Sequence, residues 1–291
     1  MVRRAFELAG RATRGVRCAL LLCALLSLSA CTAHQQRPKL TPLRADAWLV
    51  DLDVPGFGKA AVAVPLGATT PRAIVIALHG AADRPEWACS ALRSIAGPAP
   101  FVLCPRGVRR TDFPVSDARY TFGNAEATAN ELRVALKELK RRFGLYVAPG
   151  PVIFSGFEIG ADQVAWIAGQ EPAFFSRVLL IEPLPSSWPS SASALFGRSG
   201  GQRALFAFGA AHRDEFQQKV VLTGRAGAES RALFLGDRPP ALDSPARALL
   251  KKEWRWLSAP VTKPAILQNV AGNAIAAGGP VPAPKPSEIE K

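Results

Sequence analysis

The stretch Val152-Ile-Phe-Ser-Gly-Phe-Glu-Ile-Gly-Ala161 decides the fold of this chain. Its first half is apolar and predicts a buried strand, and its last residues open a helix. Gly156 and Gly160 flank Glu158, and glycine is the residue that fits where a strand and a helix pack closely across a strained turn. The stretch therefore predicts a tight strand–turn–helix unit with Glu158 at its apex.

On both sides of this unit, short apolar runs alternate with amphipathic patterns. The expected strands cover residues 60–66, 73–78, 101–104, 151–157, 178–181, 204–209 and 232–235. The expected helices cover residues 125–143, 161–169, 214–221 and 244–257. Strands that alternate with helices through short connections indicate a single α/β domain, with a mostly parallel sheet covered by helices on both faces.

Residues 1–30 predict an export signal rather than part of this domain. Arginines between Arg3 and Arg17 precede the apolar run 19–28, which is too short to span a bilayer. The run leads into Leu28-Ser-Ala-Cys31, which resembles the bacterial lipobox, where small residues precede a cysteine that receives a diacylglycerol. We expect lipid on Cys31; an ordinary cleaved signal with an incidental cysteine is the alternative.

The residue after Cys31 bears on where such a protein resides. Aspartate at that position commonly retains bacterial lipoproteins at the inner membrane, and this chain has Thr32. The resemblance therefore implies a protein of the cell envelope that is anchored to the outer membrane through lipid on Cys31 and faces the periplasm.

Composition divides the rest of the chain into three parts. Residues 31–44 carry the lipid site and a polar, proline-containing stretch that is expected to act as a tether. Residues 45–259 hold the α/β domain. Residues 260–291 are rich in proline and alanine and are expected to be disordered, because they lack large apolar groups to pack.

The chain is basic, with a formal net charge of +13 at pH 7. Residues 1–30 contribute five arginines and one glutamate, so the remainder carries +9, four less than the whole. No block of lysine and arginine is interleaved with aromatic residues, which argues against a nucleic-acid partner. A solvated basic face, or attraction to anionic lipid surfaces, fits this scattered charge better.

Five cysteines allow one intramolecular bridge in the exported protein. Cys18 and Cys23 leave with the signal and Cys31 takes the lipid. Cys89 and Cys104 then remain in a compartment that permits disulfides, and we expect them to be bridged. Two buried free thiols are the alternative.

Three landmarks in the domain follow one another in a characteristic order. A buried strand ends in Leu78-His-Gly-Ala81, a second ends in Pro105-Arg-Gly107, and the third landmark is the strand–Gly-x-x-x-Gly–helix unit around Glu158. In this order, over residues 60–257, the chain resembles the α/β-hydrolases, most closely the dienelactone-hydrolase, carboxylesterase and depolymerase-like branch.

The resemblance implies roles for backbone amides near the apex of the turn. His79, Gly80 and Ala81 correspond to the loop that supplies one oxyanion-hole amide, and Ile159, directly after the apex, supplies the other. A Rossmann dinucleotide site is the alternative for a Gly-x-x-x-Gly turn, but such a site needs Gly-x-Gly-x-x-Gly after the first strand. The unit here comes midway along the sheet, so we expect no cofactor, and no metal site is indicated.

The resemblance also exposes what is missing. Hydrolases of this fold need a serine at the apex, an acid after the seventh strand and a histidine after the eighth. Glu158 occupies the serine position. Asp214 follows the expected seventh strand and is either the acid or a helix-capping aspartate. The last histidine of the sequence, His212, precedes the eighth strand, so the general base is absent from its position.

Glu158 is not a simple replacement nucleophile. Aspartate serves as nucleophile in related dehalogenases and epoxide hydrolases, but those enzymes still need a histidine to activate the water that resolves the ester. At the start of a helix, the Glu158 carboxylate is placed to accept the oxyanion-hole amides itself. Ser155 is no substitute, because it is expected to lie buried within the strand.

These observations leave two principal interpretations. The first is a degenerate, lipid-anchored α/β-hydrolase-like domain that binds or scaffolds without catalysis, with an envelope polymer or a small acyl compound as partner. The alternative is an ester or polyester hydrolase with a non-standard site built from Glu158 and His212. A structural envelope protein that contacts anionic polymers through its basic surface is a third.

Overall fold

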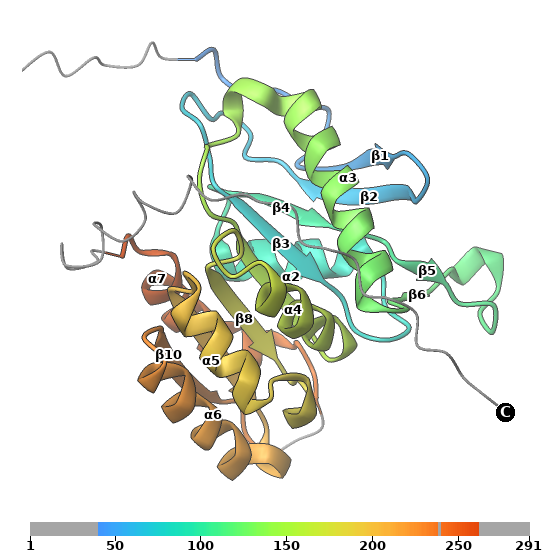
Figure 1. Cartoon of the computed structure of the whole chain (residues 1–291). Coiled ribbons are helices and arrows are strands. Elements are labelled where there is room, and N and C mark those ends of the chain that lie inside the picture. The colour runs from blue at the N-terminus through green and yellow to red at the C-terminus, as the bar shows by residue number, and fades with distance from the viewer. Residues whose placement is uncertain (1–39, 238–239, 262–291) are drawn as a thin grey trace, which may run out of the picture. The chain divides into compact units, whose positions relative to one another are not determined.

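A computed structural model of the chain describes residues 40–237 and 240–261 (Figure 1). Residues from Thr41 onward belong to one compact unit. The predicted signal, the lipid site at Cys31 and residues 262–291 of the tail predicted over 260–291 lie outside the described residues. No helix in the described part of the chain is both long and apolar enough to cross a membrane.

Within the described residues, eight strands form one sheet with the spatial order β1-β2-β4-β3-β7-β8-β9-β10. Its strands are β1 Leu49–Val54, β2 Gly58–Ala63, β3 Ile74–Leu78, β4 Phe101–Cys104, β7 Ile153–Phe157, β8 Arg177–Ile181, β9 Arg203–Phe208 and β10 Glu229–Phe234. β2 is antiparallel to both β1 and β4, and every other neighbouring pair is parallel. The predicted mostly parallel sheet is confirmed.

Helices cover both faces of this sheet. One face carries α2 Pro85–Ala96 and α7 Ser244–Ser258, and the other carries α3 Ala125–Phe143, α4 Ile159–Gln170, α5 Ser190–Arg198 and α6 Arg213–Arg225 (Figure 1). Short 3-10 turns cover Val115–Asp117, Gly144–Tyr146, Pro185–Ser187 and Ala210–His212. Each helical layer has its own cluster of buried side chains against the sheet, so the α/β fold class is confirmed.

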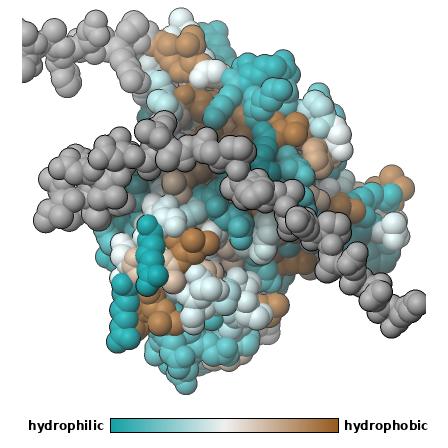
Figure 2. Space-filling view, in the orientation of Figure 1, coloured by the Kyte–Doolittle hydropathy of each residue, from teal (hydrophilic) through white to brown (hydrophobic). Residues whose placement is uncertain are grey.

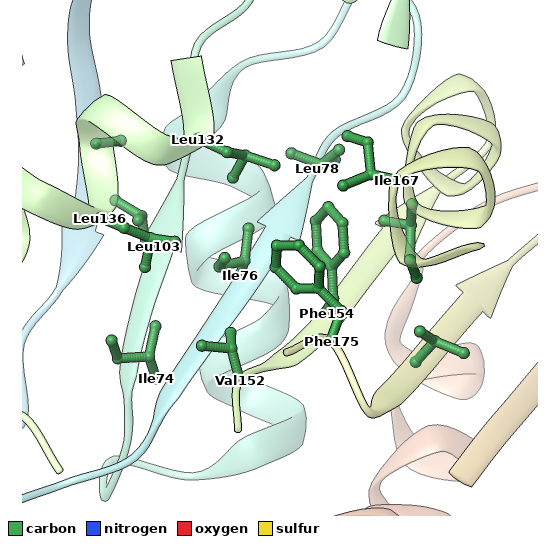
Figure 3. Packing of buried hydrophobic residues seen from close by; sticks show 14 of the residues in the cluster. Ile74, Ile76, Leu78, Leu103, Leu132, Leu136, Val152, Phe154, Ile167 and Phe175 are labelled. Carbon is green, nitrogen blue, oxygen red and sulfur yellow. The ribbon is translucent and has the colours of Figure 1, made fainter. Parts of the chain in front are cut away.

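The larger cluster lies between the sheet and the layer that contains α3 and α4. Leu132 and Leu136 of α3 and Ile167 of α4 point toward the sheet, where they meet Phe154 of β7 and Phe175 (Figure 3). The rings of Phe154 and Phe175 have centroids 4.5 Å apart. Apolar side chains at helical spacing thus fix both helices against the central strands.

The sequence predicts α3 to the residue. The Asn124 side chain accepts a hydrogen bond from the amide of Ala127 at 2.8 Å, which caps the helix, and Gly144 ends it. The closing helix begins in the same way, because the Asp243 side chain accepts from the amide of Ala246 at 3.0 Å. Local capping chemistry therefore explains why these two boundaries can be predicted.

Several elements differ from the expectation. β1, α5 and a small hairpin, β5 Val108–Arg109 with β6 Tyr120–Thr121, were not predicted. β1 is an edge strand in which apolar residues at 50, 52 and 54 alternate with the exposed Asp51 and Asp53, so its pattern does indicate a strand, whereas α5 is a short helix that begins with serines and has no strong periodic pattern. The expected tether boundary at residue 44 is also wrong, because Leu43 is buried and its amide bonds to the carbonyl of Ala68 at 2.9 Å.

A disulfide joins α2 to the end of β4. Cys89 and Cys104 are bridged with their α-carbons 5.8 Å apart, as predicted from the cysteine count. Both residues are fully buried in the cluster beneath α2 and α7. The bridge fixes α2, which follows the loop after β3, to the neighbouring strand.

Candidate functional site

The turn between β7 and α4 has the strained geometry that its glycines predict. Glu158 has φ +49° and ψ −122°, a left-handed conformation that is uncommon outside glycine. A Cβ on Gly156 would lie 2.3 Å from the carbonyl oxygen of Gly160, and a Cβ on Gly160 would lie 2.5 Å from that of His79. Neither position has room for a side chain, so the packing requires both glycines.

Backbone hydrogen bonds hold Glu158 at the carboxyl edge of the sheet. Its amide donates to the carbonyl of Ile181, at the end of neighbouring β8, at 2.9 Å. Its own carbonyl accepts from the amides of Ala161 and Asp162 in the first turn of α4. This edge, where parallel strands end and helices begin, is where open α/β sheets place their binding sites.

The Glu158 carboxyl group turns toward the loop that follows β3. One of its oxygens lies 2.7 Å from where a Cβ on Gly80 would be, and the nearby backbone amide of Ala81 favours its charged form. Burial raises the pKa of the Glu158 carboxyl, while the amide of Ala81 opposes the rise and the nearby carboxylates of Asp83 and Glu182 add to it. The Glu158 carboxyl group therefore lies against the loop that follows β3, beside Gly80 and Ala81.

His79, at the start of this loop, is buried and fully engaged. Its Nδ1 lies 2.8 Å from the carbonyl oxygen of Gly80 and its Nε2 lies 2.9 Å from that of Arg106. Its ring also packs on Phe122, with centroids 4.5 Å apart. In this arrangement His79 supports the loop, and neither ring nitrogen faces Glu158.

Glu131 is a buried carboxylate that sequence reasoning missed. It lies on the sheet-facing side of α3 and accepts hydrogen bonds from the amides of Arg106 at 2.8 Å and Gly107 at 3.1 Å. Burial raises its pKa, and these two backbone bonds partly offset the rise. Its signal in the sequence is a charged residue within the apolar stripe of a predicted amphipathic helix. Glu131 positions the Pro-Arg-Gly loop that in turn contacts His79.

A cavity of about 440 Å³ opens beside Glu158 at the carboxyl ends of the strands. Its lining includes Glu158 and Ile159 from the elbow, Asp162 from α4, Glu182 after β8, and His212 after β9. The structure therefore brings together three of the predicted site residues, Glu158, Ile159 and His212. Asp162 was not anticipated, because its contribution depends on how α4 is oriented against β8.

Two further carboxylates shape this cavity. The Asp162 carboxylate accepts a hydrogen bond from the amide of Leu184 at 2.9 Å, and partial burial raises the pKa of Asp162. Glu182 has φ +51°, and its carboxylate accepts a hydrogen bond from the amide of Gly209 at 3.1 Å. Among the described residues, no set of three histidine, cysteine or carboxylate side chains is placed to hold a metal ion. The carboxylates instead serve as acceptors for backbone amides of the surrounding loops.

His212 lines the cavity from the more exposed start of α6, and Asp214 follows it in the first turn of that helix. The Nδ1 of His212 is 3.3 Å from a carboxylate oxygen of Glu215, one turn along α6. Asp214 lies in the first turn of α6, and the capping position of that helix is held by His212. Asp214 lines a neighbouring pocket together with Asp237 rather than the cavity beside Glu158.

Ser155 lies within β7, fully buried. Its hydroxyl oxygen makes no hydrogen bond with any of the residues described in the structure. A serine enclosed by the sheet in this way cannot reach a substrate at the carboxyl edge.

Comparisons with solved structures find similar folds at low sequence identity. The carboxylesterase EstE1 from a metagenomic library aligns with a TM-score of 0.52 and 16% identity, over 76% of this chain and 92% of EstE1. FphF, a fluorophosphonate-binding serine hydrolase of Staphylococcus aureus, aligns with a TM-score of 0.51 and 10% identity, over 72% of this chain and 96% of FphF. An S-formylglutathione hydrolase from Agrobacterium tumefaciens aligns with a TM-score of 0.50 and 13% identity, over 75% of this chain and 98% of the hydrolase.

No protein-family model and no curated protein matches this sequence. At the identities found, the structural similarity concerns how the chain folds and not what it catalyses.

Proposed function

We propose that this chain, which has the α/β-hydrolase fold, is a lipid-anchored binding or scaffold protein of the cell envelope that does not catalyse hydrolysis. The fold is the one its sequence predicts. The proposed loss of chemistry concerns only the side chains at the carboxyl edge of the sheet.

One contact carries the proposal. The Glu158 carboxyl group lies against Gly80 and beside the amide of Ala81, in the loop that supplies an oxyanion-hole amide to hydrolases of this fold. An oxyanion hole accelerates acyl transfer by directing free amides at the oxygen that becomes negative. With the Glu158 carboxylate beside the Ala81 amide, a substrate carbonyl has to displace that carboxylate before it can use the amide.

The absence of a suitable base supports the same conclusion. The sequence contains no histidine after His212, so none follows β10. His79 is buried with both ring nitrogens at backbone carbonyls, and His212 is paired with Glu215. A carboxylate nucleophile at position 158 would form an ester that no positioned base helps to resolve.

The anchor and the location are part of the proposal. Cys31 follows a lipobox-like sequence and Thr32 follows it, which supports lipid attachment and an outer-membrane position facing the periplasm. Lipid on Cys31 makes the membrane the first partner. An envelope polymer or a small acyl compound is the proposed partner of the folded domain, and the scattered positive charge gives no support to a nucleic-acid partner.

Labelling with a fluorophosphonate probe and an assay against a panel of short-chain esters test the loss of catalysis. We expect neither labelling nor turnover above that of heat-treated protein. For the anchor, Cys31→Ser should move the protein out of the membrane fraction or leave its signal uncleaved. Release of the unmutated protein into the soluble fraction without detergent would refute lipid attachment.

An ester or polyester hydrolase built on Glu158 and His212 is the second candidate. One observation favours it: both residues line the same cavity of about 440 Å³, and the pKa of Glu158 is raised, as is common for acid–base groups in enzymes. Turnover that disappears in both Glu158→Ala and His212→Ala would favour this candidate over the first.

A further inference from the structure

A second cavity lies on the helical layer, between α3 and α4. It measures about 450 Å³, and its apolar lining comes from Leu132 and Leu136 of α3, Ile167 of α4, and Phe174 and Phe175. Four of these side chains, all except Phe174, belong to the buried core above the central strands, where Figure 3 shows them, and they line the cavity from beneath. The ring of Phe174 packs edge-on against that of Phe175, with their centroids 4.8 Å apart. Phe174 is 36% exposed, so part of its aromatic surface faces solvent at the cavity. We call this cavity the α3–α4 groove.

Positive side chains follow one edge of the α3–α4 groove. Arg133, Lys137 and Lys140 are all exposed and all line it, and their spacing of four and then three residues places them on one face of α3. Arg133 is bound to Glu171 at 2.6 Å, across the groove. Within residues 40–237 and 240–261, neither Lys137 nor Lys140 has an ion-pair partner.

A groove with apolar side chains beside ammonium groups that have no ion-pair partner is suited to bind an amphiphile with a negative head group. Each methylene that leaves water for these side chains favours binding, and a negative head beside the two lysines gains from their charge. Figure 2 shows the face that carries α3 and α5, where hydrophobic and hydrophilic residues are interspersed on the part that the grey atoms leave in view. The groove is built from other residues than the cavity beside Glu158, so it does not depend on the chemistry of the elbow.

We propose that the α3–α4 groove binds a single-chain anionic amphiphile, a fatty acid, with its hydrocarbon chain on Leu132, Leu136 and Phe174. The carboxylate of the fatty acid lies beside Lys137 and Lys140. This site is distinct from the elbow, and the proposal stands whether or not the elbow is catalytic.

Calorimetric titration with laurate, below its micelle concentration and at low salt, tests the proposal. The protein is the chain from Thr32 onward, which contains the whole compact unit that begins at Thr41. The test variant is Lys137→Glu with Lys140→Glu, and the matched control is Lys251→Glu with Lys252→Glu on α7, on the other face of the sheet. Both pairs are exposed lysines, and both variants change the net charge equally.

The test variant should stay folded, because Lys137→Glu places a carboxylate between Arg133 and Arg141 at favourable helical spacing. Lys251→Glu in the control lies between Arg247 and Arg255 in the same way. We expect the Kd for laurate to rise about tenfold in the test variant and less than about twofold in the control. Phe174→Ala should weaken laurate binding without any change in charge.

Dodecyltrimethylammonium, with a chain of the same length and a positive head, serves as the opposite probe. It should bind the native protein more weakly than laurate does, and it should bind better to the Lys137→Glu, Lys140→Glu variant. The proposal is overturned if laurate does not bind, if the control loses as much affinity as the test variant, or if the two probes bind the native protein equally. Association only with phosphatidylglycerol vesicles, and not with dispersed laurate, would also overturn it.

Discussion

The two sides of the elbow cavity differ in how tightly their residues are held. On the elbow side, a Cβ on Gly156 or Gly160 would lie within 2.5 Å of backbone atoms, and Glu158 is fixed by backbone bonds to β8 and α4. The cavity is also lined by His212, which lies at the exposed start of α6. The residues of the elbow are fixed by close packing in the core, whereas the residues at the start of α6 are exposed and have few packing contacts.

This difference explains how a fold can persist while the residues of its chemistry change. A substitution at the glycines disturbs the packing of β7 against α4 and therefore acts on stability. A substitution in the loops after β9 and β10 meets little packing and therefore acts on chemistry alone. The elbow keeps its backbone even though Glu158 stands where hydrolases of this fold have serine.

The largest effect is expected at the elbow. Gly160→Ala should lower the free energy of unfolding by more than about 3 kcal/mol, because its Cβ would meet the carbonyl oxygens of His79 and Leu78 at 2.5 and 2.6 Å. Gly169→Ala, in the same helix with nothing within 4 Å, is the control and should be neutral or stabilising by up to about 1 kcal/mol. Urea denaturation measures both, and equal losses would contradict the comparison.

The disulfide supports the other face of the sheet, in the layer of α2 and α7. Replacing Cys89 and Cys104 together with alanine should lower the free energy of unfolding by about 3 kcal/mol, as expected for a bridge between residues 15 apart. Thermal unfolding of the variant beside the parent, without reductant, measures the loss. An unchanged midpoint would mean that packing alone fixes α2 to β4.

Exchange of the apex residue separates architecture from chemistry. Glu158→Ser should fold at least as well as the parent, because it removes a partly buried charge, but it should not react with a fluorophosphonate. A serine without a histidine base stays protonated. Glu158→Ser combined with Asp237→His is the variant in which we expect weak ester hydrolysis, because it supplies a histidine after β10. Reaction of Glu158→Ser alone would show that the side away from the elbow still contains a base.

The smallest effect is a pH dependence at Glu158. The pKa of Glu158 is higher in the folded protein than in the unfolded chain, so folding disfavours its charged form. Its contribution to stability is therefore fully present at a pH below the pKa of the unfolded chain, and it is lost as the pH rises through the pKa of the folded protein. The stability gained by Glu158→Gln should therefore grow as the pH rises above about 4, by less than about 1 kcal/mol, since the group is half exposed.

Glu229→Gln provides a control of opposite sign. The Arg203 guanidinium beside it holds the pKa of Glu229 below its ordinary value. Glu229→Gln should therefore lower the free energy of unfolding at a pH above the ordinary pKa of glutamate, where Glu229 is charged, and should have no such cost at low pH. Urea midpoints over a range of pH measure both variants. A Glu158→Gln advantage that grows as the pH falls would contradict the assigned environment of Glu158.

The sequence predicts those parts of the molecule whose causes are local. Two glycines identify the elbow, Asn124 identifies the start of α3, and the cysteine count identifies the bridge. The position of Glu158 at a helix start also predicts that its carboxylate accepts an amide of the loop after β3. The amide beside it, from Ala81, follows from how β3 and β7 pair.

Other parts depend on contacts that are distant in sequence and could not be predicted. Glu131 bonds to amides of residues 106 and 107, which only the packing of α3 beside β4 brings close. Asp162 and Glu182 line the cavity because α4 packs against β8. β1 differs from these, because its alternating apolar and acidic residues over 50–54 do indicate a strand in the sequence.

The occupation of the oxyanion position by Glu158 is the central claim, and ester hydrolysis by native protein beside Glu158→Ala tests it most directly. Removing the carboxylate frees the Ala81 amide but supplies neither a nucleophile nor a base. We predict no turnover by the native protein and at most a trace by Glu158→Ala. Clear turnover by the native protein that Glu158→Ala abolishes would contradict the account and identify Glu158 as a catalytic residue.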